Sequence, residues 1–434
     1  MTSALFTDRY ELTMIDAALR AGTAHRRTVF ELFARRLPDG RRFGVVAGTG
    51  RLLELLRDFR FGEAELEWLA AERVVSDETL AWLADFRFTG SMRGYREGEL
   101  YFPGSPILVV EGTFAEAVVL ETLALSIFNY DSAVASAAAR MVAAADGRPI
   151  AEMGSRRTGE HSAVAAARAA YLAGFAASSN LEAGRTWGVP TMGTAAHSFT
   201  LLHDSETDAF RAQLDALGTG TTLLVDTFDT HRGVETAIRV AGPELGAVRI
   251  DSGDLRTVVA AVRAQLDGLG ATRTRITVTN DLDEFAIAAL RAAPVDSYGV
   301  GTALVTGSGA PASGMVYKLV AVQDEDEAPS GWRAVGKTSE SKATVGGRKQ
   351  AFRALTAGVA TSEDVYVDDP PVAERPALRA LMTELVVDGE PVAEHLGPEG
   401  LRRAREHHAR AIAELPDAAL ALSHGEPALP TRYL

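Results

Sequence analysis

The chain has 434 residues, 47% of them apolar and 24% charged, so it can build two or three structural parts around a sizeable core. Its net charge of -14 argues against a nucleic-acid-binding surface, because phosphate contacts need concentrated lysine and arginine. The absence of cysteine excludes disulfides, thiolate metal sites and cysteine nucleophiles. The first residues lack a signal-peptide pattern, and no apolar run approaches the ~20 residues of a spanning helix. We therefore expect a soluble cytoplasmic protein with neither a membrane nor a nucleic-acid partner.

The first third of the chain predicts a mixture of helices and strands. A capping-box spacing at residues 8–11 and an apolar stripe over residues 12–22 predict an N-terminal helix. Strand-like runs follow at TVFELFA, FGVVAG and SPILVVEG, with helical stretches between them. A long alanine-rich helical stretch covers about residues 114–145, with an interruption expected near residues 129–131. We expect residues 1–130 to form an α+β domain.

A different rhythm begins near residue 149. The short runs PIAEMG, VPTMGT, TLLVDTF, AVRIDSGD, RITVTND and SYGVGTALVTG each end in polar residues, and helical stretches separate several of them. This alternation is typical of parallel βα units. Six or seven such strands predict an irregular α/β barrel over residues 131–335, with a doubly wound sheet as the alternative. Residues 336–434 are expected to be a C-terminal segment that packs with the N-terminal domain.

Polar side chains recur where these predicted strands end. They are Arg156, Arg157, Thr194, His197, Arg249, Asp251 and Thr302. In a barrel, the carboxyl ends of the strands meet at one mouth, so these side chains would converge there. Cations, hydroxyls, a carboxylate and an imidazole together suit a phosphorylated substrate. For the histidine alone, the alternative is an ordinary hydrogen-bonded structural residue.

Two loops and a group of lysines add further candidates. Gly301 and Thr302 lie in a glycine-bearing loop whose backbone N–H groups could approach phosphate, although it matches neither the P-loop nor the dinucleotide pattern. Asp226 and Asp229 follow an apolar strand, and form either a divalent-metal and ribose site or a capped strand-end turn. The four lysines all lie in one segment, which indicates either a phosphate-gripping function or chance. They are Lys318, Lys337, Lys342 and Lys349.

Eight motifs in order resemble those of nicotinate phosphoribosyltransferase. They are TDRYELTM, EMGSRR, FAASSN, GTAAHSF, RIDSGD, GVGTALVT, VYKLV and SESKATVGGRKQAFR, and they cover nearly the whole chain. The resemblance implies an α/β domain beside an irregular barrel of about seven strands, assembled as a homodimer with shared active sites. It also implies a reaction that joins nicotinate to 5-phosphoribosyl 1-diphosphate with coupled ATP hydrolysis and Mg²⁺, giving nicotinate mononucleotide and pyrophosphate.

The same resemblance implies roles for individual residues. His197 is the position that ATP phosphorylates, a role that suits imidazole because it is largely a neutral nucleophile near pH 7. Thr194 and Arg249 would contact nicotinate, and Thr302 would hold the phosphoribosyl diphosphate. Tyr10 would stack on the pyridine from the partner subunit, whereas its pattern alone indicates helix packing.

The chemistry of the reaction suggests roles for the charged residues. Departure of pyrophosphate leaves an oxocarbenium-like sugar, which Asp251 could stabilise directly or through Mg²⁺. Asp226 and Asp229 are further candidate metal ligands. The departing phosphates would be neutralised by Arg156, Arg157, Lys318 or Lys342. Ser178 and Ser179 stand near the position where the related nicotinamide enzyme carries an aspartate, and their lack of charge favours nicotinate over nicotinamide.

Other functions remain as alternatives. A nicotinamide or quinolinate phosphoribosyltransferase would keep the fold, although the quinolinate enzymes resemble a shorter version without the GTxxH histidine. A barrel aldolase would need a buried Schiff-base lysine, yet no lysine precedes Lys318. A metal-dependent hydrolase would need a histidine–carboxylate cluster, and the pair at residues 407–408 is predicted on an exposed helix. A nucleotide-sensing module without catalysis is the non-enzymatic alternative.

Overall fold

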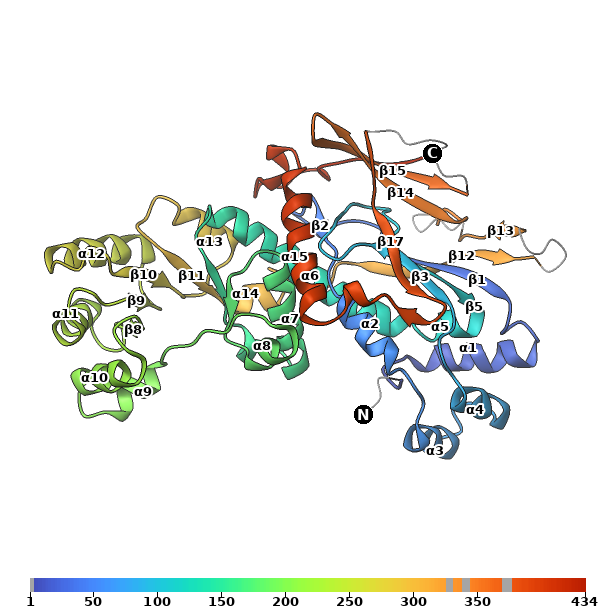
Figure 1. Cartoon of the computed structure of the whole chain (residues 1–434), viewed down its shortest axis with the longest axis horizontal. Coiled ribbons are helices and arrows are strands. Elements are labelled where there is room, and N and C mark those ends of the chain that lie inside the picture. The colour runs from blue at the N-terminus through green and yellow to red at the C-terminus, as the bar shows by residue number, and fades with distance from the viewer. Residues whose placement is uncertain (1–3, 325–330, 338–343, 369–376) are drawn as a thin grey trace. The chain divides into compact units, whose positions relative to one another are not determined.

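The structure is a computed structural model and describes residues 4–324, 331–337, 344–368 and 377–434. Contacts within the chain divide it into two compact units, unit 1 (residues 1–136 and 310–434) and unit 2 (residues 137–309). The helices and strands of both units are labelled in Figure 1.

Unit 1 is an α+β structure with antiparallel sheets. Its helices are α1 (Arg9–Arg20), α2 (Thr49–Arg57), α3 (Glu63–Ala71), α4 (Asp77–Ala84), α5 (Phe114–Val118), the first part of α6 (Glu121–Ala145), α15 (Gly397–Ala413) and the 3-10 turns η3 (Ala393–His395) and η4 (Asp417–Leu420). Its described strands are β1 (Arg27–Ala34), β2 (Gly44–Val45), β3 (Ser91–Tyr95), β4 (Leu100–Tyr101), β5 (Leu108–Thr113), β12 (Met315–Gln323), β13 (Trp332–Ala334), β14 (Lys349–Thr356), β15 (Val359–Val367), β16 (Leu378–Ala380), β17 (Met382–Val387), β18 (Glu390–Pro391) and β19 (Thr431–Tyr433).

The described strands of unit 1 form three sheets. The largest has seven strands in the order β13-β12-β1-β5-β3-β17-β18, and its pairs are antiparallel. A four-stranded sheet has the order β16-β14-β15-β19, and β2 pairs with β4. The N-terminal and C-terminal segments share the largest sheet, because β17 pairs with β3.

The boundary predicted at residue 335 differs from the observed division. The sequence placed residues 310–335 in the barrel, but β12 pairs with β1 along most of its length and so belongs to unit 1. The apolar pattern of a strand shows that the strand is buried, but it does not show which strand lies beside it. Here the partner, β1, is nearly 300 residues away in the chain. The stacked rings of Phe30 and Tyr317, with centroids 5.0 Å apart, fix this pairing in the core.

Two features of the N-terminal helices also differ from expectation. Asp8 is the N-cap of α1, but its side chain makes no capping bond, and Glu11 instead accepts hydrogen bonds from the N–H and the hydroxyl of Thr122 at 2.9 and 2.6 Å. Helix α6 continues through residues 129–131, and the break falls at residues 119–120. The polar groups within α6 are satisfied by tertiary contacts, as when Asn129 accepts the backbone N–H of Met315 at 2.8 Å.

One helical stretch passes a length and hydropathy test for a membrane span. It covers residues 114–145 among the described parts of the chain, and 67% of its most apolar window is buried inside the structure. That degree of burial is typical of the core helix of a folded domain.

Unit 2 alternates strands and helices. Its helices are the second part of α6, η1 (Ser155–Arg157), α7 (Glu160–Leu172), α8 (Leu181–Trp187), α9 (His197–Leu202), α10 (Glu206–Leu217), α11 (Thr230–Ala241), α12 (Leu255–Gly268), α13 (Glu284–Ala289) and α14 (Thr302–Val305). Its strands are β6 (Ile150–Glu152), β7 (Ala177–Ser178), β8 (Thr222–Leu224), β9 (Ala247–Ile250), β10 (Arg275–Val278) and β11 (Ser297–Val300).

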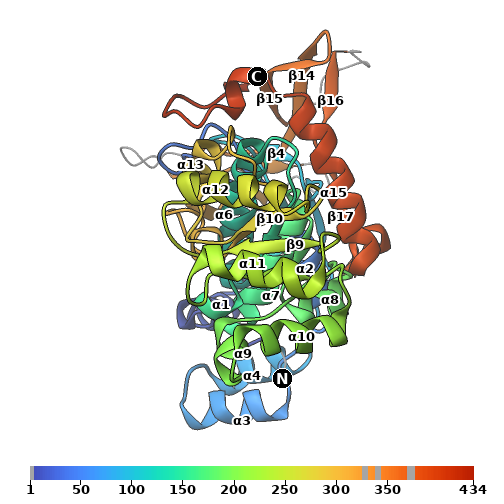
Figure 2. The ribbon, with the colours of Figure 1, turned by 90° about the vertical axis from the view of Figure 1, so that its left-hand side faces the viewer.

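The six strands of unit 2, all of whose residues are described, form one parallel sheet. Its order is β7-β6-β11-β10-β9-β8. Six strands lie within the six or seven expected from the sequence, and the VPTMGT segment contributes only an isolated bridge between Ser178 and Thr191. Helices α11 and α12 pack together and lie on one side of β8–β10 (Figures 1 and 2). All six strands contribute residues to a single cavity on the opposite face, so the sheet is curled.

Candidate active site

The imidazole of His197 lies where two strand-end loops meet. His197 is the first residue of α9, and its Nδ1 atom is 3.1 Å from Oγ1 of Thr227 in the loop after β8. Its Nε2 atom is 3.6 Å from Oδ2 of Asp251, the residue directly after β9. The side chains of His197 and Asp251 are 40% and 35% exposed, so both can reach a ligand. The sequence did not single out Thr227.

Two carboxylates lie beside each other at the ends of β8 and β9. Oδ2 of Asp226 accepts hydrogen bonds from the backbone N–H of Asp251 at 2.8 Å and from the hydroxyl of Ser252 at 2.6 Å. Oδ1 of Asp251 accepts the hydroxyl of Thr279, after β10, at 2.6 Å. Oδ1 of Asp226 is buried and has no hydrogen-bond donor among the described residues. That oxygen is therefore open to a cation or a hydroxyl donor.

Arg249 lies on the concave face of β9, two residues before Asp251. Its Nη1 atom donates to Oγ1 of Thr194 at 3.2 Å, and its Nε atom is buried without an acceptor among the described residues. Burial lowers the pKa of Arg249, Arg156 adds to this effect, and the neighbouring carboxylates oppose it. A poorly solvated guanidinium of this kind favours an anionic ligand.

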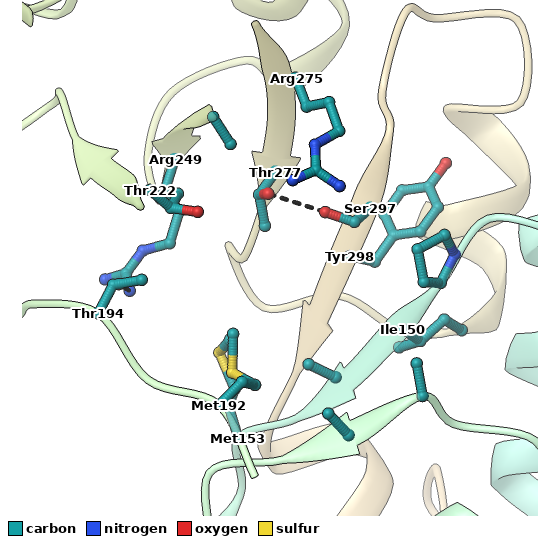
Figure 3. Close-up of a pocket in the computed structure, with 15 residues that line it drawn as sticks. Ile150, Met153, Met192, Thr194, Thr222, Arg249, Arg275, Thr277, Ser297 and Tyr298 are labelled. Atoms are coloured by element: carbon teal, nitrogen blue, oxygen red, sulfur yellow. Dashed lines mark hydrogen bonds between the residues drawn. The ribbon is translucent and has the colours of Figure 1, made fainter. Parts of the chain in front are cut away.

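A cavity of about 220 Å³ lies on the concave face of the sheet (Figure 3). Its lining residues are Pro149, Ile150, Ala151, Met153, Ala176, Ala177, Met192, Thr194, Thr222, Ala247, Arg249, Arg275, Thr277, Ser297 and Tyr298. Two of these are arginines and none is acidic, so the cavity favours a negative charge. Small alanines replace the bulky layer that usually fills a barrel. The volume suits a single small ring, because drug-sized ligands need pockets of ~300 Å³ or more.

The cavity joins the carboxyl-end site through Arg249. Ala247, Arg275 and Ser297 begin their strands, so the cavity extends toward the amino ends of the sheet. Arg249 and Thr194 line it from the side of the carboxyl-end cluster, and Figure 3 shows the Arg249 side chain extending toward Thr194. A ligand that reaches Arg249 from the rim would therefore place its anionic end inside the cavity.

Ser178 and Ser179 have different surroundings. Ser178 is fully buried and donates its hydroxyl to Oε2 of Glu152 at 2.5 Å, whereas Ser179 is exposed. The hydroxyl of Ser178 is engaged inside the fold, so Ser179 is the more accessible of the two serines for the predicted contact with nicotinate. Sequence reasoning missed Glu152, although its place at a strand end in EMGSRR was a signal.

The two predicted phosphate-binding segments pack against each other. Arg156 and Arg157 are exposed in η1, after β6, and Thr302 is the exposed first residue of α14, after β11. Strands β6 and β11 are neighbours in the sheet. A Cβ atom on Gly154 would lie 3.1 Å from the carbonyl oxygen of Gly301, so the backbones of the two turns are in close approach. The structure thus brings both segments to one edge of the sheet.

Tyr10 lies in unit 1, on α1. Its side chain is 45% exposed, while the buried face of this helix is formed by other residues. Its hydroxyl hydrogen-bonds to Glu121, and burial together with nearby carboxylates raises the pKa of Tyr10 to about 12. The ring is therefore a partly exposed, neutral aromatic surface.

Two of the four lysines, Lys318 and Lys349, have partners within unit 1. Lys349 is buried, and its Nζ atom lies 2.7 Å from Oε2 of Glu31. Lys318 donates to a backbone carbonyl at 2.6 Å and lies 3.9 Å from Oε1 of Glu121, so part of its charge is offset within unit 1. Lys342 lies outside the described residues. The clustering of lysines in the sequence is thus explained in part by the fold.

Two other candidates have ordinary structural roles. Asp229 caps α11 by accepting the backbone N–H of Arg232 at 2.9 Å, which is the capped-turn alternative. His408 is buried on α15, not exposed, and its Nδ1 atom lies 3.0 Å from the carbonyl oxygen of Gly98. Among the described residues, no group of three or more histidines and carboxylates could hold a metal ion.

A curled parallel sheet with cations, hydroxyls and carboxylates at its carboxyl edge is typical of an α/β enzyme that handles a phosphorylated substrate. The family model described as the nicotinate phosphoribosyltransferase (NAPRTase) N-terminal domain matches residues 5–129. Nicotinate phosphoribosyltransferase pncB1 of Mycobacterium tuberculosis is 59% identical over 440 residues, covering 99% of this chain and 95% of that protein. The nicotinate phosphoribosyltransferase of Bacillus subtilis is 36% identical over 373 residues, covering 84% of this chain and 75% of that protein.

The fold matches as well. The crystal structure of human nicotinic acid phosphoribosyltransferase superposes with a TM-score of 0.81 at 27% identity, covering 98% of this chain and 97% of that chain. The chain belongs to the nicotinate phosphoribosyltransferase family.

Proposed function

We propose that this chain transfers a 5-phosphoribosyl group from 5-phosphoribosyl 1-diphosphate to nicotinate, giving nicotinate mononucleotide and pyrophosphate for the synthesis of NAD. The observation that carries the proposal is the position of Arg249. It lines a cavity without acidic residues and also lies two residues from Asp251, whose carboxylate neighbours His197. The names of the relatives from M. tuberculosis and B. subtilis support the same activity.

Nicotinate enters with its carboxylate toward the cavity. The guanidinium of Arg249 and the hydroxyl of Thr194 bind the carboxylate, and the exposed Ser179 offers a neutral hydroxyl nearby. The ring nitrogen then faces the rim, where the sugar phosphate is held. Discrimination against nicotinamide comes mainly from Arg249, because its guanidinium attracts the carboxylate charge that the amide lacks.

In the transfer step, the lone pair of the pyridine nitrogen forms a bond to C1 of the ribose. The bond from C1 to the pyrophosphate oxygen breaks, and pyrophosphate leaves with both electrons. Asp251 stabilises the positive charge on the sugar, while Arg156 and Arg157 neutralise the leaving group and Thr302 binds phosphate. Removing one preorganised group of this kind typically costs about 2.7–4 kcal/mol of transition-state stabilisation.

His197 couples the reaction to ATP. An imidazole nitrogen attacks the γ-phosphorus of ATP, the bond to ADP breaks, and water later releases phosphate from the histidine. Nε2 faces the carboxylate of Asp251 and Nδ1 faces the hydroxyl of Thr227, so both nitrogens of the ring have polar neighbours in the site.

Mg²⁺ fits the same edge of the sheet. The ion usually takes one or two carboxylates and completes its shell with water and substrate phosphates, so a larger protein cluster is unnecessary. Asp226, whose Oδ1 has no donor among the described residues, and Asp251 would hold it. When bound, the ion supplies positive charge to the diphosphate. Asp229, used as a helix cap, is the weaker candidate.

The site is completed by a second copy of the chain. Several large apolar side chains are exposed in the segments that follow the strands of unit 2, namely Leu181, Leu201, Leu202 and Phe228. Exposed apolar groups around a polar site indicate a covering partner. Tyr10, exposed on unit 1, would be placed over the pyridine ring of the partner's site in a homodimer. Lys318 and Lys342 remain candidates for binding the phosphates.

We also infer that unit 2 is the irregular barrel of about seven strands, with the segment at Thr191 as the incomplete strand. We place the enzyme in the cytoplasm. The aldolase alternative is not supported, because unit 2 contains no lysine. If the chain were instead a nucleotide sensor without catalysis, it would form no nicotinate mononucleotide.

The decisive experiment measures nicotinate mononucleotide and pyrophosphate from purified enzyme, with and without ATP. We expect product from nicotinate and a higher yield with ATP. Preferential turnover of nicotinamide or quinolinate in parallel assays would reassign the substrate, and no turnover with any base would support the sensor.

A further inference from the structure

A buried carboxylate lies between the two strand ends that carry the proposed base and phosphate contacts. Glu152 is the last residue of β6 and is fully buried. Its Oε2 atom accepts the hydroxyl of Ser178 at 2.5 Å, and its Oε1 atom accepts the backbone N–H of Gly154. Its backbone carbonyl accepts the N–H of Ser179 at 2.9 Å. Glu152 is therefore hydrogen-bonded to the segment after β6, through Gly154, and to the segment after β7, through Ser179.

The hydrogen bonds continue from Ser178 to the arginine turn. The backbone N–H of Asn180 donates to Oγ of Ser178 at 2.9 Å, and the Asn180 side chain donates to Oγ of Ser155 at 3.0 Å. Ser155 directly precedes Arg156. We call Glu152, Ser178, Asn180 and Ser155 the Glu152 network. It runs from the end of β6 to β7 and back to the turn that carries the arginines.

Both side-chain oxygens of Glu152 face hydrogen-bond donors, so both must act as acceptors. Its two side-chain bonds come from a hydroxyl and a backbone N–H, and no cation is among the influences on its pKa, which burial raises. A buried carboxylate without a cation is costly, and its hydrogen bonds to Ser178 and Gly154 offset part of that cost. The turn packs closely against α14, because a Cβ on Gly154 would lie only 2.3 Å from Cγ1 of Val305. The carboxylate thus fixes a turn that is already packed tightly.

We propose that Glu152 is a positioning residue, which sets the spacing between Ser179 at the base and Arg156 and Arg157 at the phosphates. The proposal rests on the proposed function and deepens it. Glu152 touches neither substrate, and acts through Ser178 and the backbone of the arginine turn. Because misplacing a reacting group by about 1 Å can cost ~10²-fold in rate, loss of this link would affect both substrates together.

The test compares E152A, E152Q and S178A with the wild type in steady-state kinetics. We expect E152A to raise KM for both nicotinate and 5-phosphoribosyl 1-diphosphate about tenfold or more and to lower kcat. E152Q keeps one acceptor and loses the other, so it should recover only part of the loss. The E152A/S178A double variant should be no worse than E152A, because both changes break one link.

A control separates positioning from general stability. Gln213 is also buried in unit 2, and it ties α10 to the amino end of β8 by donating to the carbonyl of Thr222 at 2.9 Å. Q213A should lower the melting temperature without changing either KM. An E152A variant that behaves like Q213A, or fully additive effects of E152A and S178A, would overturn the proposal.

Two further outcomes are distinguishable. If the wild type makes no nicotinate mononucleotide, the proposed function fails. Calorimetric binding of nicotinate and pyrophosphate to wild type and E152Q then tests positioning by itself. If E152A does not fold, E152Q and S178A decide the matter, with KM increases of about threefold or more expected for both substrates. Unchanged values in both variants would refute the role.

Discussion

Nε2 of His197 lies 3.6 Å from Oδ2 of Asp251, and these residues come from different βα units. The separation is longer than a hydrogen bond, and such contacts commonly shorten when substrate binds. The pair therefore connects the imidazole proposed to be phosphorylated with the carboxylate proposed to stabilise the sugar.

Replacing His197 should separate ATP use from base transfer. We expect H197A to abolish labelling of the protein by [γ-³²P]ATP, while reduced, ATP-independent formation of nicotinate mononucleotide survives because the other groups remain. D251N should lower labelling and transfer together, by about 10²–10³-fold. The matched control is H203A, since Nδ1 of His203 lies 2.8 Å from the carbonyl oxygen of Phe199 in the same short helix. Labelling that persists in H197A would exclude the role.

Binding of the nicotinate carboxylate should depend on Arg249 more than on Arg275, the other arginine of the cavity. We expect R249A to raise KM for nicotinate about 10–100-fold, as for loss of a charged hydrogen bond, with a smaller effect on 5-phosphoribosyl 1-diphosphate. Arg275 lines the same cavity on the adjacent strand, two residues nearer the amino end, so R275A should change KM less than about threefold. Equal effects of the two variants would place the carboxylate elsewhere.

The two adjacent serines should respond differently to a new carboxylate. S179D adds charge at an exposed position, where it repels nicotinate and can accept the N–H of an amide. We expect the ratio of kcat/KM for nicotinate over nicotinamide to fall about 100-fold. S178D instead places a second carboxylate beside Glu152 in a buried site. We expect it to lower the melting temperature measured by thermal unfolding. A soluble, stable S178D with altered base preference would contradict the observed burial.

A shared active site makes a prediction about mixed dimers. Assayed at a nicotinate concentration well below the raised KM of R249A, Y10A and R249A should each have little activity, because one loses the aromatic lid and the other the carboxylate contact. Refolded as a mixture, they should recover up to about a quarter of wild-type activity, since half of the dimers are hybrid and each contains one intact site. Mixing R249A with H197A, which damage the same site, is the control and should recover nothing. No recovery with Y10A would place Tyr10 in its own subunit's site or in none.

Acid stability should depend on one buried histidine. Burial lowers the pKa of His408 to about 4, so in the folded state its ring is neutral while the unfolded chain binds a proton below its ordinary value of 6.5. The unfolded state thus holds more protons between these values, and the stability from this group is complete above pH 6.5 and declines as pH falls toward 4.

Urea unfolding followed by circular dichroism at pH 7 and pH 4.5 tests this dependence. The change in unfolding free energy between the two pH values should be smaller in H408Q than in wild type, by up to about 3 kcal/mol. The glutamine amide can still donate to Gly98. H231Q, at an exposed position, should follow the wild type. Identical pH dependence in H408Q and wild type would refute the assignment.

The sequence was sufficient to predict the parallel strands of unit 2 and the polar residues at their carboxyl ends. Short apolar runs separated by helical stretches can be buried only as βα units, and parallel strands end at the same edge of a sheet. For that reason His197, Arg249 and Asp251 could be expected together from their places after different strands. Their roles in nicotinate and ATP chemistry came from resemblance to a family, since local pattern cannot name a substrate.

Tertiary structure decided which partners the polar groups find. The sequence shows two similar serines at 178 and 179, yet only the fold buries the first against Glu152. Likewise, Glu11 bonds to Thr122 and not to the N-terminus of its own helix, and β12 joins β1 and not the parallel sheet. Periodicity follows from each segment's own side chains, whereas a hydrogen-bond partner depends on which distant segment arrives beside it. The chain alone therefore determined the elements and the edge at which they end, and only folding decided which side chains remain free to meet a ligand.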